Sequence, residues 1–170
     1  MANQRRKHHF WRNLLILIVL LGLFLCWDNS SIETDEVTFT SLALPAGFDG
    51  CRVVHLSDLH GKYFGEDNER LYSAVKAAQP EYIFVTGDLV DRKTENPTIY
   101  AGEVGAALSA IAPTYYVTGN HEWGHGTKVV EEIKRTLRES GVTVLSNEFM
   151  YLARNGDTIV LAGIDDPNGY

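Results

Sequence analysis

Two hydrophobic periods alternate along most of the chain. Short, nearly continuous apolar runs predict strands, and apolar side chains recurring every three or four residues predict helices. The predicted strands cover residues 52–57, 82–86, 115–118, 142–145, 149–153 and 158–162, the last two joined by a turn at Asn155-Gly156-Asp157. The predicted helices are centred on residues 71–78, 104–111 and 130–137. This alternation of strands and helices predicts a layered α/β domain.

Two features of the pattern add detail. Residues 37–44 (VTFTSLAL) alternate between apolar and polar positions and end at Pro45, which predicts a further strand. The run at 82–86 (YIFVT) is apolar on successive residues, as in a strand buried on both faces of a parallel sheet.

A longer apolar run, at residues 14–27, contains no charged residue and lies between Trp11 and the acidic Asp28. Its basic flank and its terminal tryptophan predict a transmembrane signal-anchor, with a cleavable signal peptide as the alternative. The predicted organisation is a basic cytoplasmic tail (1–13), the anchor (14–27), a polar tether (28–36) and one α/β domain (37–170).

Charge is distributed unevenly along the chain. The net charge is −7, and four of the 15 basic residues lie in the first 12 positions, which hold no acidic residue. The rest of the chain therefore carries all 22 acidic residues, which argues against a nucleic-acid partner. Two cysteines are too few for a disulfide framework.

Polar side chains follow three of the predicted strands, at the point where each strand ends. Asp58 and His60 follow the first strand, Asp88 follows the second, and Asn120 and His121 follow the third. The carboxyl ends of neighbouring parallel strands meet at one edge of a sheet, so these five side chains are expected to lie together.

Metal binding is the chemistry that this set predicts. Carboxylate, imidazole and amide donors suit Mn, Fe or Zn better than Ca or Cu(I). Asp88 lies on the middle strand, where its carboxylate can bridge two ions, and a two-metal site binds phosphoryl oxygens and activates water.

The segments SDLHG, GDLVDR and GNHE resemble the signature blocks of the calcineurin-like metallophosphoesterase superfamily, and the chain looks like its membrane-anchored bacterial YkuE-like or YaeI-like phosphohydrolases. The resemblance implies a layered βαβ metallophosphoesterase fold. It implies a phosphoester hydrolase, a phosphodiesterase or phosphohydrolase, that uses a metal-bound hydroxide at a dinuclear site with two divalent or trivalent ions.

The same resemblance implies roles for the residues that match the motifs. Asp58 and His60 would bind the first metal, Asp88 would bridge, and Asn120 would bind the second metal. His121 would be the catalytic histidine, protonating the leaving group or stabilising charge on the phosphoryl oxygens. Two further assignments follow the same motifs: Glu122 as a partner that orients His121, and Arg92 as a phosphate contact, with a solvated arginine as its alternative.

The family's later blocks, a further histidine and a G-H-x-H segment, have no counterpart here, because no histidine follows His125. The chain is therefore expected to be the amino-terminal part of a longer enzyme with an incomplete sandwich, or a shortened protein. A non-catalytic, membrane-tethered binding protein or inactive fragment is the rival function. His55 is expected on a sheet face, His125 in a loop, and Asp165 and Asp166 at a helix start or turn.

Location and substrate follow from the predicted anchor. The positive-inside rule places the acidic domain on the outer side of a bacterial cytoplasmic membrane, with a single pass through the bilayer. Lipid-linked or cell-envelope phosphoesters are the substrates that this location suggests.

Overall fold

The computed structural model describes residues 2–28 and 32–167. The chain divides into two compact units, residues 1–34 and residues 35–170, which are described separately.

The first unit consists of one helix, α1 (Ala2–Asp28). No helix in the described part of the chain is both long and apolar enough to cross a membrane, so the transmembrane helix predicted over residues 14–27 is not found. The apolar run is short for that purpose: fourteen helical residues rise about 21 Å, against about 30 Å for a bilayer's hydrocarbon core.

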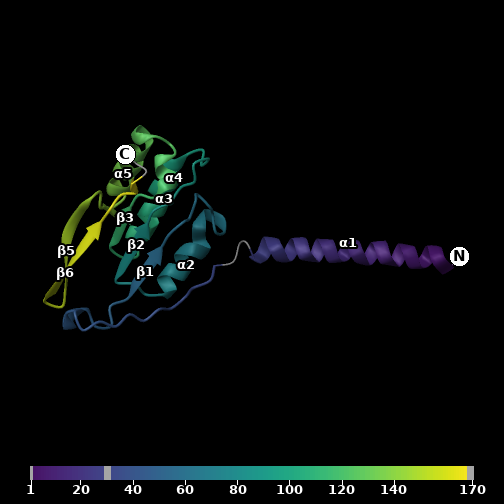
Figure 1. Cartoon of the computed structure of the whole chain (residues 1–170), viewed down its shortest axis with the longest axis horizontal. Coiled ribbons are helices and arrows are strands. Elements are labelled where there is room, and N and C mark those ends of the chain that lie inside the picture. Colours follow the sequence, from purple (N-terminus) through teal and green to yellow (C-terminus); the bar gives the residue numbers. More distant parts are fainter. Residues whose placement is uncertain (1, 29–31, 168–170) are drawn as a thin grey trace. The chain divides into compact units, whose positions relative to one another are not determined.

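A four-stranded parallel sheet organises the second unit (Figure 1). Its strands lie in sequence order: β1 (Val53–Leu56), β2 (Tyr82–Thr86), β3 (Thr114–Val117) and β4 (Thr143–Val144). Val53 pairs with Tyr82, and Ile83 with Thr114, so the strands run in register and their carboxyl ends meet at one edge. The sequence therefore predicted these four strands to within two residues at each end.

The connections between these strands contain the helices. The α-helices are α2 (Glu69–Ala77), α3 (Pro97–Ser109), α4 (Asn120–Trp123) and α5 (Thr127–Glu139), and the short 3₁₀ turn η2 (Glu66–Asn68) precedes α2. Pro97 begins α3, where its missing N–H costs nothing. Gly141, with φ +91°, follows the end of α5.

The apolar faces of these helices bury the main core. Val104 and Leu108 of α3 and Ile133 and Leu137 of α5 are almost fully buried, as is Ile83 of β2. Each such side chain contributes about 1.5–3 kcal/mol when it leaves water. The helical spacing in the sequence therefore identified the face that packs.

A separate antiparallel hairpin, β5 (Glu148–Arg154) and β6 (Asp157–Gly163), turns at the predicted Asn155-Gly156. Together with the 3₁₀ turn η1 (Ala46–Phe48) it forms a second apolar cluster around Phe48, Tyr115 and Leu152. Arg154 holds this corner, because its guanidinium donates to both carboxylate oxygens of Glu81 at 2.7 Å and to the carbonyl of Gly47.

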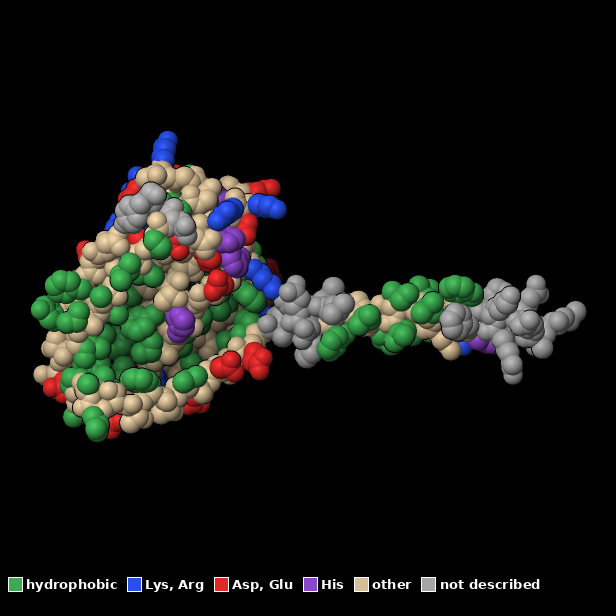
Figure 2. Space-filling view, in the orientation of Figure 1, with side chains coloured by type: hydrophobic (Ala, Val, Ile, Leu, Met, Phe, Trp, Pro, Cys, Tyr) green, Lys and Arg blue, Asp and Glu red, His purple; other side chains and the backbone are tan. Residues whose placement is uncertain are grey.

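The second apolar cluster is only partly shielded from solvent. In β2, Ile83 and Val85 are buried whereas Tyr82 and Phe84 are only half-buried, so the strand predicted to be buried on both faces is fully buried on one. Figure 2 shows hydrophobic side chains gathered in a hollow on this unit.

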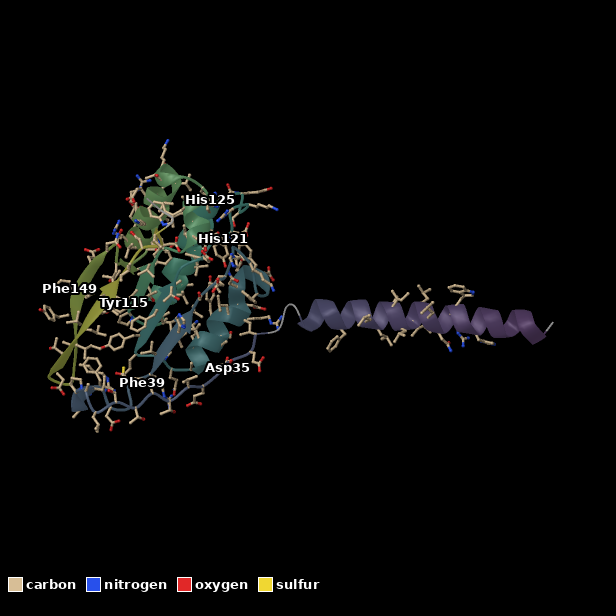
Figure 3. All side chains as sticks on the ribbon, in the orientation of Figure 1. Asp35, Phe39, Tyr115, His121, His125 and Phe149 are labelled. Carbon is tan, nitrogen blue, oxygen red and sulfur yellow. The ribbon has the colours of Figure 1, made fainter. Side chains whose placement is uncertain are left out.

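The prediction of a strand over residues 37–44 is wrong. This segment makes no strand pairing, and Val37 and Phe39 are 86 % and 80 % exposed. An alternating pattern makes a strand only where a neighbouring strand satisfies its backbone, and none lies beside these residues in the described part of the chain. Phe39 is labelled in Figure 3.

Candidate metal centre

The loops that follow β1 and β2 stay hydrogen-bonded to each other beyond the ends of the strands. The N–H of Asp58 donates to the carbonyl of Gly87 (3.3 Å), and the N–H of His60 donates to the carbonyl of Asp88 (2.9 Å). A further bond joins Gly61 to Leu89 at 2.9 Å. This ladder fixes the first predicted pair of ligands beside the predicted bridging carboxylate.

Three of these loop residues have left-handed backbone conformations. Asp58, His60 and Asp88 have φ values of 57°, 51° and 50°. Left-handed φ costs a non-glycine residue roughly 1 kcal/mol or more, and such strain clusters at functional sites. The left-handed conformations at this sheet edge therefore lower the stability of the fold while they orient these three side chains.

Two glycines let the loops after β2 and β3 approach closely. A Cβ on Gly87 would lie 2.5 Å from the backbone nitrogen of Gly119, and a Cβ on Gly119 would meet the carboxylate of Asp88. Any side chain at either position would push apart the loops that carry Asp88 and His121.

Asp58, His60 and Asp88 form the first group of possible metal ligands. One donor atom from each lies within 4.8 Å of the others, and His60 Nε2 is 3.6 Å from Asp58 Oδ1. The structure therefore brings together three of the four predicted metal ligands in one group.

A second group shares His60 and adds Asp91 and His121. Oδ2 of Asp91 lies 3.2 Å from Nδ1 of His121 and 4.0 Å from Nδ1 of His60, and the two imidazole rings are 4.5 Å apart between centroids. Sequence reasoning missed Asp91. The signal was present as the second aspartate of GDLVD, three residues after Asp88.

The donor atoms in these groups fit a metal ion. Nδ1 of His60 is buried and has no hydrogen-bond partner among the described residues, and Nδ1 of His121 is buried beside the Asp91 carboxylate at 3.2 Å. Buried ring nitrogens without partners are costly unless a ligand satisfies them. A hydrogen bond from the Lys93 N–H and the neighbouring His121 and His60 hold the pKa of Asp91 below its usual value, so its carboxylate is charged.

Asn120 lies against the carboxylate of Asp88, as the second-metal prediction requires. One end of its amide lies 3.3 Å from Asp88 Oδ2 and the other lies 3.2 Å from Arg92 Nη2. Without a metal ion, hydrogen bonding favours the orientation in which the nitrogen donates to Asp88 and the oxygen accepts from Arg92. A metal beside Asp88 would reverse this amide, because an ion is bound by oxygen and not by the NH₂ group. Arg92, predicted to contact phosphate, thus lies at the site.

Glu122 makes contacts different from the predicted ones. Its fully buried carboxylate accepts hydrogen bonds from the backbone N–H groups of Asp88 (3.1 Å), Val90 (3.2 Å) and Gly119 (2.8 Å). The acid beside the imidazole of His121 is Asp91. Glu122 instead ties the loop after β2 to the start of α4.

The two other histidines of the second unit have partners. His55 Nε2 lies 2.6 Å from Thr86 Oγ1 on the neighbouring strand, consistent with a sheet-face residue. His125 Nε2 lies 2.7 Å from the backbone carbonyl of Asp91, so this loop histidine supports the segment that carries Asp91. Figure 3 labels His121 and His125, which lie close together around α4.

Asp165 has a structural position outside both groups. Its buried carboxylate pairs with Lys134 Nζ (3.1 Å) and accepts hydrogen bonds from Thr118 and Ser146. Burial alone would raise its pKa, but these hydrogen bonds and the charge of Lys134 bring the pKa below its usual value. The predicted turn or helix-start role is replaced by a buried ion pair.

Residues 51–168 match the family described as calcineurin-like phosphoesterase. The match covers more than half of the chain and contains every residue of the two ligand groups. The chain therefore belongs to this family, which supports a metal-dependent phosphoesterase.

Named relatives agree with that assignment. The chain is 34 % identical over 160 residues to "Uncharacterized metallophosphoesterase YkoQ" of Bacillus subtilis (90 % of this chain, 58 % of the relative). It is 33 % identical over 144 residues to "Uncharacterized metallophosphoesterase YkuE" of the same organism (79 % and 48 %). It is also 33 % identical over 128 residues to "Transmembrane protein with metallophosphoesterase domain" of Danio rerio (72 % and 29 %). The chain spans about half the length of the two bacterial relatives.

Proposed function

We propose that the protein containing this chain hydrolyses a phosphoester at a site for two metal ions. The observation that carries the proposal is the ligand group Asp58-His60-Asp88 at one sheet edge, with Asp91 and His121 placed beside its His60. Metal chemistry explains the shared sheet edge, the strained backbone of Asp58, His60 and Asp88, and the unpaired Nδ1 of His60. Because the chain spans about half of its bacterial relatives, the activity of the whole protein is part of the proposal.

The ligands have separate tasks in this proposal. Asp58 and His60 would hold the first ion, Asp88 would bridge the two ions, and Asn120, whose amide lies beside Asp88 Oδ2, would hold the second. Bound Mn, Fe or Zn ions would supply an activated water and neutralise charge on the phosphoryl oxygens.

His121 acts on the substrate from the start of α4. Its backbone N–H donates to Asp88 Oδ1 (2.9 Å), which fixes the position of its ring relative to the bridging carboxylate. Asp91 Oδ2 lies 3.2 Å from Nδ1 of the same ring, where it can hold the imidazole in position while the ring donates a proton to a departing alcohol. Arg92, beside Asn120, provides a fixed positive charge for a phosphate oxygen.

Membrane location and an outward-facing domain belong to the same proposal. The apolar run at residues 14–27 with its basic flank supports it, as does a relative named as a transmembrane protein. Lipid-linked and cell-envelope phosphoesters are the substrates proposed on this basis. Protease access to the acidic domain from outside intact cells tests the orientation, and full protection would contradict it.

The test of the chemistry is metal-dependent turnover of a chromogenic phosphodiester by the full-length protein, with and without added Mn²⁺. Asp88→Asn should abolish turnover and weaken binding of both ions. His121→Ala should lower kcat while metal content stays unchanged.

Asp49→Asn is the matched control, since Asp49 is an exposed carboxylate outside both ligand groups. Equal loss of metal in the Asp88 and His121 variants would contradict their separate roles. Metal binding without any turnover would support the rival function, a binding protein.

A further inference from the structure

A cavity of about 500 Å³ opens directly beside the second ligand group. This volume is within the range of sites for small organic molecules. Its wall includes two metal-site residues and four others that have no part in the proposed chemistry: His60, Asp91, Tyr63, Thr94, Asn96 and Tyr100. A phosphoester held at the metals would therefore have this space next to its reacting phosphorus.

Tyr63 presents a fixed aromatic ring on the wall of this cavity. The side chain is 50 % exposed, yet two contacts hold it. Its ring meets the ring of Tyr100 edge-to-face (centroids 5.2 Å apart, planes at 90°), and its hydroxyl donates to Glu103 Oε2 at 2.9 Å. Tyr100 is itself 2 % exposed and donates to the carbonyl of Lys62 at 2.8 Å. The exposed face of Tyr63 is thus already ordered before any ligand arrives.

Thr94, which also lines the cavity, is held in place as well. Thr94 packs against Gly61, where an added Cβ would lie 2.5 Å from Thr94 Oγ1. The same hydroxyl accepts a hydrogen bond from the Asp91 N–H (2.9 Å). These contacts hold Thr94 on the cavity wall, where Lys93, Glu95 and Asn96 add polar side chains.

We propose that this cavity is the subsite for the alcohol part of the substrate, and that it selects an alcohol built on a ring, with Tyr63 as the surface on which the ring stacks. Nucleosides and sugars share the required chemistry, which is a ring face that can stack (the flat base of a nucleoside or the C–H face of a sugar) together with sugar hydroxyl groups. Aromatic rings favour such faces by stacking. The inference rests on the proposed function, since it places the phosphate at the metal ligands.

The experiment measures competition by phosphate monoesters against hydrolysis of bis(p-nitrophenyl) phosphate, using the full-length protein with Mn²⁺. The competitors are methyl phosphate, glucose 1-phosphate and adenosine 5′-monophosphate. The wild-type protein should bind at least one ring ester about fivefold to tenfold more tightly than methyl phosphate. Which ring ester binds better distinguishes a sugar from a nucleoside.

Variants separate stacking from general effects. Tyr63→Leu keeps an apolar side chain but removes the flat ring, so the preference for ring esters should fall to about twofold or less. Tyr63→Phe should retain most of it. Tyr151→Leu is the matched control, because Tyr151 is also an exposed tyrosine but lies on β5 outside the cavity wall.

Equal affinity of the wild-type protein for methyl phosphate and for the ring esters would overturn the inference. This comparison uses the wild-type protein alone, so it does not depend on the folding of any variant. An unchanged ring preference in a folded Tyr63→Leu protein would overturn it as well. Failure of the proposed function has a different signature: no turnover of the diester with any metal. In that case calorimetric titration of the same three esters still measures the ring preference.

Discussion

Nδ1 of His121 lies 3.2 Å from Oδ2 of Asp91, an acid that arrives from a different loop. Asp91 follows β2 and His121 is the second residue of α4, so the contact joins two of the three segments that form the site. The backbone of Asp91 is supported in turn, since its carbonyl lies 2.7 Å from His125 Nε2. The acid is therefore placed to favour one orientation of the His121 ring.

Asp91→Asn tests this relationship in the full-length protein. The amide keeps an oxygen for the Lys93 N–H but loses the negative charge beside the imidazole. We expect kcat to fall by about tenfold to a hundredfold, the usual effect of removing a carboxylate that supports a working histidine. Steady-state kinetics and metal analysis check this prediction together. An unchanged kcat would exclude a supporting role for Asp91. Loss of bound metal with an unchanged kcat of the metal-loaded protein would mean that Asp91 acts only as a metal ligand.

Glu122→Gln tests the buried tie between the loops after β2 and β3. The carboxylate accepts three backbone N–H groups, whereas a glutamine amide brings its own NH₂ donors against them. We expect a loss of about 2–3 kcal/mol in the free energy of unfolding, because charged hydrogen bonds in a buried place are replaced by a mismatch. Denaturant unfolding measures it.

Glu139→Gln provides the comparison for that measurement. Glu139 is a 69 % exposed side chain on α5 whose ion pair with Arg135 is long, at 3.8 Å. Its substitution should change stability by about 0.5 kcal/mol or less. Similar effects for the two glutamates would show that the three backbone contacts of Glu122 contribute little.

Gly119→Ala tests the close approach of the same two loops. Its Cβ would meet the backbone nitrogen of Asp88 at 2.5 Å, a position that only a loop movement can relieve. Displacing Asp88 should weaken metal binding by about tenfold or more, as for other changes that misplace a ligand. Gly22→Ala is the control, since a Cβ there meets nothing within 4 Å. Titration with Mn²⁺ measures both, and equal affinity would mean that the loops have room to separate.

Local sequence features predicted most of the fold. The parallel strands, the three long helices and the hairpin each follow from periodicity and from turn residues such as Gly141 and Asn155-Gly156. The segment 37–44 shows the limit, because its alternation describes a strand but cannot supply the neighbouring backbone that pairs with it. The apolar run at 14–27 predicted a helix, but no helix of the described residues has the properties of a membrane span.

The sequence could predict those parts of the site that directly follow the ends of the parallel strands. Asp58, His60 and Asp88 could be grouped because their positions follow directly from parallel strands. That Asp91 and not Glu122 lies beside the His121 ring could not be predicted, because it depends on how the loop after β2 turns. The backbone of Asp88 has a left-handed conformation, and in the loop that follows it the Asp91 carboxylate lies beside the His121 ring. The Glu122 carboxylate instead accepts hydrogen bonds from backbone N–H groups, including that of Asp88.

A final prediction concerns the buried pair of Asp165 and Lys134. Both side chains are almost fully buried, and Lys134 Nζ also lies 5.0 Å from the centre of the Trp123 ring. Asp165→Asn would leave the Lys134 charge without its main partner, so the free energy of unfolding should fall by about 3 kcal/mol near pH 7. Denaturant unfolding at several pH values measures the effect, with the exposed Asp49→Asn as the control.

The pH dependence of this pair gives the sharper test. The pKa of Asp165 is below its usual value in the folded protein, so its stabilising contribution is complete above the ordinary aspartate pKa of about 3.9 and is lost as the pH falls through the lower, folded value. The difference between wild type and Asp165→Asn should therefore be constant from pH 7 to about pH 5 and shrink below pH 4. A difference that shrinks already between pH 7 and pH 5 would mean that another group controls it. The ion pair joins α5 to the segment after β6, so its loss in acid should first loosen the hairpin side of the unit.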